Sequence, residues 1–185
     1  MKHFCKSLVF LLSLVLTASL FLAGCGAKTD ESSTGPATPS LETGSFDVSK
    51  LLTREEAATI LGEAVNPAKI TLPDITPAQG HLLFFDTASA NGNYLQVGVI
   101  PDSAELAAIN QTAELLYTTT RDQIVQNGIS VEGIGDEAVW GTKPNFLYIL
   151  KEPYYITIAV SGNGDATADF ELAKKVAALI SPRLP

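Results

Sequence analysis

The chain has 185 residues and carries 20 acidic side chains against 12 basic ones, which gives a formal net charge of −8. It contains no basic cluster that could neutralise a phosphate backbone, and this argues against nucleic-acid binding. The acidity also argues against electrostatic docking on anionic lipid, so a solvated acidic surface is the interpretation that we favour.

An uncharged, mostly apolar run lies close to the start of the chain. Lys2 and Lys6 precede it, and it extends over residues 8–23. A bilayer-spanning helix needs roughly 20 apolar residues, so this run is short for a permanent span. A basic start, a short apolar core and small residues after it are typical of a secretory signal peptide. We therefore predict that residues 1–24 are a signal peptide.

The tetrapeptide Leu22-Ala23-Gly24-Cys25 ends this run. It resembles the lipobox of bacterial lipoproteins. By that resemblance, Cys25 would be the first mature residue and would carry a thioether-linked diacylglycerol on the extracytoplasmic face of the cell membrane. Two or more acyl chains anchor a protein stably without a transmembrane helix. The alternative is cleavage by an ordinary signal peptidase, with Cys25 incidental.

The cysteine content has a consequence for the mature chain. Cys5 would leave with the signal peptide and Cys25 would be acylated, and the sequence has no other cysteine. A mature domain without a free thiol has no disulfide, no thiol nucleophile and no thiolate metal site. We therefore expect the domain to be stabilised by its hydrophobic core alone.

Residues 26–44 consist mainly of small, polar and acidic residues with almost no bulky apolar side chain. Such a segment cannot bury enough surface to offset the entropy lost on ordering. We predict that residues 25–45 comprise the lipidated cysteine and a disordered tether, and that residues 46–185 form a single domain. About 140 residues are ample for one core.

The first half of this domain shows one clear helix and one hairpin. Thr53 and Glu56 form a capping-box pattern, and Gly62 is typical of a helix C-cap. Residues 81–86 and 94–100 are predicted to be strands, the second with apolar residues at alternate positions, and the turn residues 91–93 between them favour a hairpin.

A long helix is predicted over residues 103–126, with Asp102 as its cap. Its buried side follows the three- and four-residue spacing of Leu106, Ile109, Ala113, Leu116, Tyr117 and Ile124.

The second half is predicted to contain strands at residues 129–134, 137–140, 146–150 and 154–160, rich in aromatic and β-branched side chains. A last helix begins near Ala166 and ends at Ser181-Pro182. Strand runs joined by hairpin turns imply a largely antiparallel sheet packed with about three helices. The fold class is therefore α+β.

Two segments resemble known domains. Residues 53–62, with the sequence TREEAATILG, and residues 133–140, with the sequence GIGDEAVW, resemble the opening helix and the central turn and strand of small Gram-positive secreted lipoproteins of unknown function. The resemblance implies an α/β/α-type sandwich related to the PsbP-like fold. It implies no catalytic residues.

Candidate catalytic side chains are few. His81 is the only histidine after residue 24, so a catalytic triad or a zinc site has little support, and we expect no metal or other cofactor. Asp136 and Glu137 follow two glycines beside Trp140 and are compatible with an acidic pocket. A turn-forming aspartate explains the same pattern, and we favour that interpretation.

Four aromatic residues, Trp140, Tyr148, Tyr154 and Tyr155, cluster in the predicted strands. If they project from an uncovered sheet face, they form a binding patch together with Asp136 and Glu137, because aromatic side chains concentrate at interfaces. If they pack beneath helices they are core, which is the interpretation that we favour.

These observations favour a non-catalytic, lipid-anchored binding or accessory protein of the cell envelope. Its partner would be another envelope protein or, less in keeping with the sequence, a small apolar or peptide ligand. Two alternatives stay open: a small carboxylate-dependent hydrolase using Asp136 and Glu137, and a structural protein that spaces envelope layers.

Overall fold

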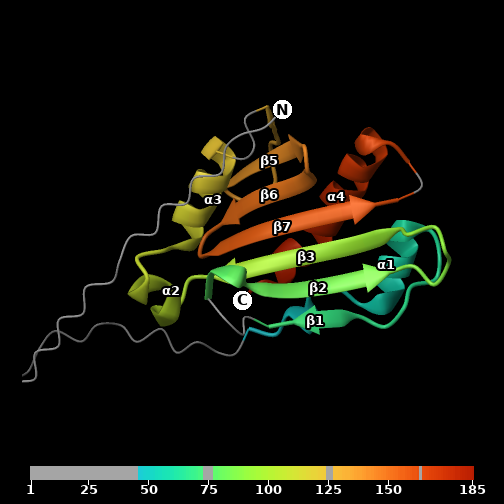
Figure 1. Ribbon diagram of the computed structural model, residues 1–185, viewed down its shortest axis with the longest axis horizontal. Helices are drawn as coiled ribbons and strands as arrows, with labels where there is room; N and C mark the ends of the chain where they lie inside the picture. Colours follow the sequence, from blue (N-terminus) through green and yellow to red (C-terminus); the bar gives the residue numbers. More distant parts are fainter. Residues whose placement is uncertain (1–45, 73–76, 124–126, 163) are drawn as a thin grey trace, which may run out of the picture. The chain divides into compact units, whose positions relative to one another are not determined.

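The computed structural model describes residues 46–72, 77–123, 127–162 and 164–185 (Figure 1). The predicted signal peptide, Cys25 and the predicted tether lie outside the described residues, so these three assignments stay predictions. Ile124, expected on the buried side of the long helix, lies outside them as well.

The described residues form a seven-stranded sheet in which every neighbouring pair is antiparallel. The strand order is β1-β2-β3-β7-β6-β5-β4, with β3 and β7 side by side at its centre (Figure 1). The strands are β1 Lys69–Thr71, β2 His81–Asp86, β3 Tyr94–Pro101, β4 Ile129–Ser130, β5 Glu137–Thr142, β6 Asn145–Lys151 and β7 Tyr154–Ser161.

The α-helices of the described residues pack on both faces of this sheet. Helices α1 and α4 lie on one face, and α3 lies over β6 and β7 on the other. The helices are α1 Arg54–Leu61, α2 Ala104–Ala108, α3 Ala113–Gln123 and α4 Ala166–Ile180, with short 3-10 turns η1 Val48–Lys50, η2 Pro77–Gln79 and η3 Ser181–Arg183. The predicted α+β class is confirmed. Helices on both faces fit the expected sandwich, whereas the PsbP-like relationship stays a prediction.

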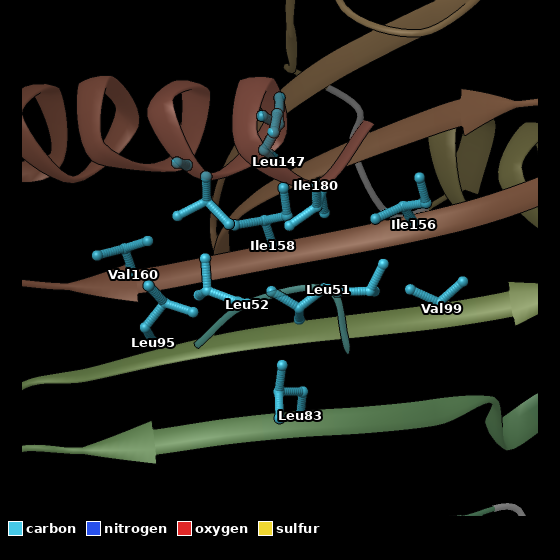
Figure 2. Packing of buried hydrophobic residues seen from close by; sticks show 14 of the residues in the cluster. Leu51, Leu52, Leu83, Leu95, Val99, Leu147, Ile156, Ile158, Val160 and Ile180 are labelled. Carbon is cyan, nitrogen blue, oxygen red and sulfur yellow. The ribbon is translucent and has the colours of Figure 1, made fainter. Parts of the chain in front are cut away.

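The main core lies between the sheet and helices α1 and α4. We call this face of the sheet, which carries Leu83, Val97 and Ile158, the inner face; these three side chains are fully buried. Figure 2 shows Leu51 and Leu52, from the segment after η1, among the side chains of β2, β3 and β7. Burial of large aliphatic side chains contributes roughly 1.5–3 kcal/mol each. This layer is therefore the main source of the domain's stability.

Helix α1 has the ends that its sequence predicts. The Thr53 hydroxyl accepts a hydrogen bond from the Glu56 N–H (3.2 Å), and the Glu56 carboxylate accepts one from the Thr53 N–H (2.9 Å). Gly62 takes a left-handed conformation with φ of 73° and ends the helix. The capping-box and C-cap predictions are confirmed.

The predicted long helix over residues 103–126 is wrong, because the chain breaks between α2 and α3. Asn110 adopts a left-handed conformation with φ of 56°, which asparagine tolerates better than most residues. Ser103, not Asp102, caps α2, and the Asp102 carboxylate accepts from the Ala113 N–H at the start of α3 (2.6 Å). Ile109, expected to be buried, is 48% exposed. The capping contacts of Ser103 and Asp102 therefore determine where the helices begin and end, and the apolar periodicity does not.

The predicted strand over residues 129–134 is also too long. Only Ile129–Ser130 pairs as strand β4, and the chain then turns through Gly133 and Gly135, whose φ angles are both positive. A turn of this kind suits glycine, which has no Cβ to clash. The other predicted strands agree with β2, β3, β5, β6 and β7 to within two residues at each end.

A bidentate ion pair joins the C-terminal turn η3 to helix α1. The Arg183 guanidinium donates to both carboxylate oxygens of Glu56, and one of its nitrogens also donates to the Leu51 carbonyl (2.8 Å). These donors, together with the Thr53 N–H, lower the pKa of Glu56 to about 2 from an ordinary value of 4.5. The contact links two segments that lie far apart in the sequence.

We predict that Glu56→Gln lowers the free energy of unfolding at pH 7 by about 1–2 kcal/mol, because a paired, partly exposed carboxylate is lost. Since the folded-state pKa is depressed, this contribution is fully present above pH 4.5 and fades as the pH falls towards 2. Urea unfolding at pH 7 and pH 2.5 measures it. Glu55→Gln, in the same helical turn, is the control and should change little at either pH. An equal deficit at both pH values would contradict the prediction.

Candidate functional site

Trp140 and Tyr154 belong to the inner face of the sheet. Trp140 is 2% exposed and packs against Phe170 of α4, with 5.0 Å between ring centroids. Tyr154 is 8% exposed, lies against Phe46, and its hydroxyl donates to the Pro185 carbonyl (3.3 Å). Both aromatic rings therefore contribute to the core.

Tyr148 and Tyr155 lie on the opposite face, beneath α3. They form a second buried cluster with Tyr117, and the Tyr155 hydroxyl donates to the Thr120 hydroxyl of α3 (3.0 Å). Burial raises the pKa of Tyr155 to about 12, so its phenol stays protonated at neutral pH. The four aromatic residues are thus split between two faces and buried, as the core alternative requires. They do not form one exposed patch.

Asp136 and Glu137 each hold a separate structural contact. The Asp136 carboxylate accepts from the Glu152 N–H in the β6–β7 turn (2.8 Å). The Glu137 carboxylate accepts from the Arg121 guanidinium of α3 (2.7 Å). The Asp136 contact supports the turn interpretation, and neither contact positions a water or a nucleophile.

These two carboxylates line a hollow of about 500 Å³ between α3 and the β4–β5 turn. Tyr117 and Arg121 line its α3 side, and Glu132 lies on the turn. Burial, with the Glu137 charge nearby, raises the pKa of Tyr117 to about 12. The two carboxylates that a hydrolase would use are engaged, Glu137 by the Arg121 guanidinium and Asp136 by the Glu152 N–H. The hydrolase alternative therefore gains no support from this geometry.

His81 begins strand β2 and contributes packing. Its ring meets Phe46 edge-on with 5.3 Å between centroids, and its Nδ1 atom is buried and makes no hydrogen bond to a described residue. Burial lowers its pKa below the ordinary value of 6.5. A neutral imidazole packed beside Phe46 is a structural group.

Two acidic residues at the start of α4 also have structural partners. Asp165 caps α4 by accepting from two backbone N–H groups, and the buried Asp169 accepts from the Gly162 N–H (2.8 Å). Within the described ranges, no group of three or more His, Cys, Asp or Glu side chains is placed to hold a metal ion. The expectation of no cofactor stays a prediction.

The sequence does not reveal a hollow of about 380 Å³ on the other face of the sheet, which we call the outer face. Leu82, Gln96 and Thr157 belong to this face, and α3 covers only its β6–β7 side, leaving these three side chains half-buried. The hollow is lined by Thr71, Leu72, Gln79, Gly80, Leu82, Gln96, Gly98, Val99, Ile100, Tyr155 and Thr157. The alternation of β3 indicates its outward-facing residues, but no local pattern shows that a helix leaves them uncovered.

Two glycines shape the hollow. At the floor, a Cβ on Gly98 would lie 2.5 Å from the Thr157 hydroxyl oxygen. At the wall, Gly80 has φ of +67°, and a Cβ there would lie 2.5 Å from Ile100 Cγ1. Because a real Cβ does not lie so close to another atom, a larger residue at either position would require these neighbours to shift. Glycine at both positions therefore fits the observed shape of the hollow.

The polar side chains that the structure places in the lining of the hollow are neutral. Among the described residues, this lining contains no charged side chain. The side chains of Thr71, Gln79, Gln96 and Thr157 make no hydrogen bond to any residue that the structure describes. Convergent polar groups set among apolar ones are typical of ligand sites. We therefore take this hollow, which we call the outer-face hollow, as the candidate functional site.

Comparisons with protein-family models, curated proteins and solved structures found no match to this chain. No helix in the described part of the chain is long and apolar enough to span a bilayer. The candidate site is therefore inferred from the residues of this chain alone.

We predict that His81 makes the domain less stable in mild acid. Its folded-state pKa lies below 6.5, so the unfolded chain binds the proton first and stability falls as the pH drops from about 6.5 towards the folded pKa. His81→Phe keeps an aromatic ring beside Phe46 and removes this titration. The unfolding free energy of the variant relative to the parent should rise between pH 7 and pH 5 in denaturant titrations. A constant difference would contradict the prediction.

Proposed function

We propose that this chain is a lipid-anchored lipoprotein of the cell envelope, whose folded domain binds a partner without catalysis through the outer-face hollow. The anchor is supported by the Leu22–Cys25 lipobox and the apolar run before it. The domain would then work outside the cytoplasmic membrane, at the end of the predicted tether.

The observation that carries the binding proposal is the contrast between the two hollows. In the hollow beside α3, Arg121 pairs with Glu137 (2.7 Å), and the Asp136 carboxylate accepts from the Glu152 N–H (2.8 Å). In the outer-face hollow, Gln96 and Thr157 have no hydrogen-bonding partner among the described residues. Polar groups left unsatisfied by the fold are available to a ligand. A binding role therefore fits this surface better than catalysis.

The anchor proposal predicts the behaviour of two cysteine variants. Cys25→Ser removes the acylated thiol, so the protein should lose palmitate labelling and leave the membrane fraction. Cys5→Ser is the matched control: that residue would depart with the signal peptide, so labelling and membrane association should be unchanged. Retention of label in Cys25→Ser, or a mature N-terminus other than residue 25 by mass spectrometry, would contradict the anchor.

The binding proposal predicts where the domain meets its partner. A photo-crosslinking residue in place of the exposed Thr71, at the rim of the hollow, should give a discrete product when whole cells are irradiated. The same residue in place of the exposed Lys175 on α4 is the control and should not give that product. Adding Gln96→Glu to the Thr71 variant should abolish it. An identical product from both positions, or none from Thr71, would contradict a binding role for the hollow.

A further inference from the structure

We propose that the outer-face hollow binds an uncharged ligand through a secondary amide, the group shared by peptides and N-acetylated sugars. This inference rests on the proposed binding function and adds the chemical class of the ligand. It is carried by the absence of charged side chains among the described residues of the lining and by the neutral polar side chains there.

The lining selects against charge. A charged ligand loses its hydration on entry, and it finds no opposite charge among the described residues that line the hollow. On the same face of the sheet, Lys69 and Asp86 form an ion pair with each other at 3.0 Å. The chain is acidic overall, which further disfavours an anion. A neutral ligand avoids both the desolvation of a charge and the repulsion between an anion and the acidic chain.

The polar side chains match an amide. Gln79 and Gln96 each present a donor N–H₂ and an acceptor carbonyl, and Thr71 and Thr157 each present a hydroxyl that donates and accepts. A secondary amide also carries one donor and one acceptor. Since these side chains have no partner within the described residues, a bound amide would satisfy them at no cost to bonds inside the fold.

The apolar side chains of the lining suit the carbon atoms that flank an amide group. Leu72 is 54% exposed beside the hollow, and Leu82 and Ile100 are half-buried in its lining. Such groups can contact the methyl or Cα carbons that flank an amide. At the floor, a Cβ on Gly98 would lie 2.5 Å from the Thr157 hydroxyl oxygen, so glycine leaves room for this hydroxyl. The volume of about 380 Å³ lies at the small end of ligand sites, which are roughly 300–1,000 Å³.

Titration calorimetry on the full lipidated chain in detergent micelles tests the ligand class. Two amide probes are used: the trimer of N-acetylglucosamine and N-acetyl-alanyl-alanine methylamide. Two matched probes lack the neutral amide: the deacetylated trimer, which is cationic, and the glucose trimer, which is neutral but bears only hydroxyls. At least one amide probe should bind about tenfold or more tightly than both of the others. Which amide probe binds identifies the source as sugar or peptide.

Variants assign any binding to this hollow. Gln96→Glu introduces a charge with little change in shape and should weaken the bound amide probe by about tenfold or more. Thr157→Val removes one hydroxyl and should weaken it by about three- to tenfold. Gln123→Glu adds the same charge at an exposed position of α3 and should leave affinity within about twofold. Circular dichroism and thermal unfolding establish that all three variants fold.

Three results would overturn the inference: no amide probe binds, a matched probe binds as tightly, or both hollow variants bind like the parent. If any of these occurs while the Thr71 crosslink in cells persists and is lost with Gln96→Glu, the ligand class is wrong and the proposed binding function stands. If that crosslink is absent as well, both proposals fall.

Discussion

The pairing of β3 with β7 is the interaction on which the rest of the structure depends. It joins Tyr94–Pro101 to Tyr154–Ser161 at the centre of the sheet, so the two halves of the domain share one core. On the inner face it sets Val97 beside Ile158 beneath the helices. On the outer face the same register sets Gly98 opposite Thr157, which forms the floor of the hollow. One register thus determines both the core and the candidate site.

The outer face has room for the candidate site because its helical cover is incomplete. Helix α3 packs Tyr117 over Tyr148 and Tyr155, and this cluster shields the β6–β7 side. The break at Asn110 ends α2 early and lets Asp102 fix the start of α3. The β2–β3 side keeps half-buried residues where the inner face has fully buried ones. Such partial cover resembles the arrangement of many ligand sites, in which a rigid sheet supports a surface that no helix occupies.

The sequence predicts what is local and misses what depends on tertiary contacts. The α1 caps, the alternating strands and the β2–β3 hairpin follow from neighbouring residues, and the structure confirms them. The division of the helix over 103–126 depends on Asp102 reaching Ala113, a contact that periodicity does not encode. The sequence points to aromatic and acidic residues, which pack into the core or join turns and helices. The candidate site lies instead among Gln96, Gly98 and Thr157, which no motif marks.

In the proposed site, where the described lining residues are neutral, ligand selectivity would come from hydrogen bonding and shape. Charged side chains act over roughly 8–10 Å at physiological salt and attract any counter-charge within that range. Amide and hydroxyl groups act only in contact, and a ligand that leaves Gln96 or Thr157 unpaired loses their bonds and desolvates them as well. In the proposed binding mode, that penalty would distinguish an amide from an apolar or charged molecule of similar size. The described side chains of the hollow would then select among neutral ligands by hydrogen bonding and shape rather than by charge.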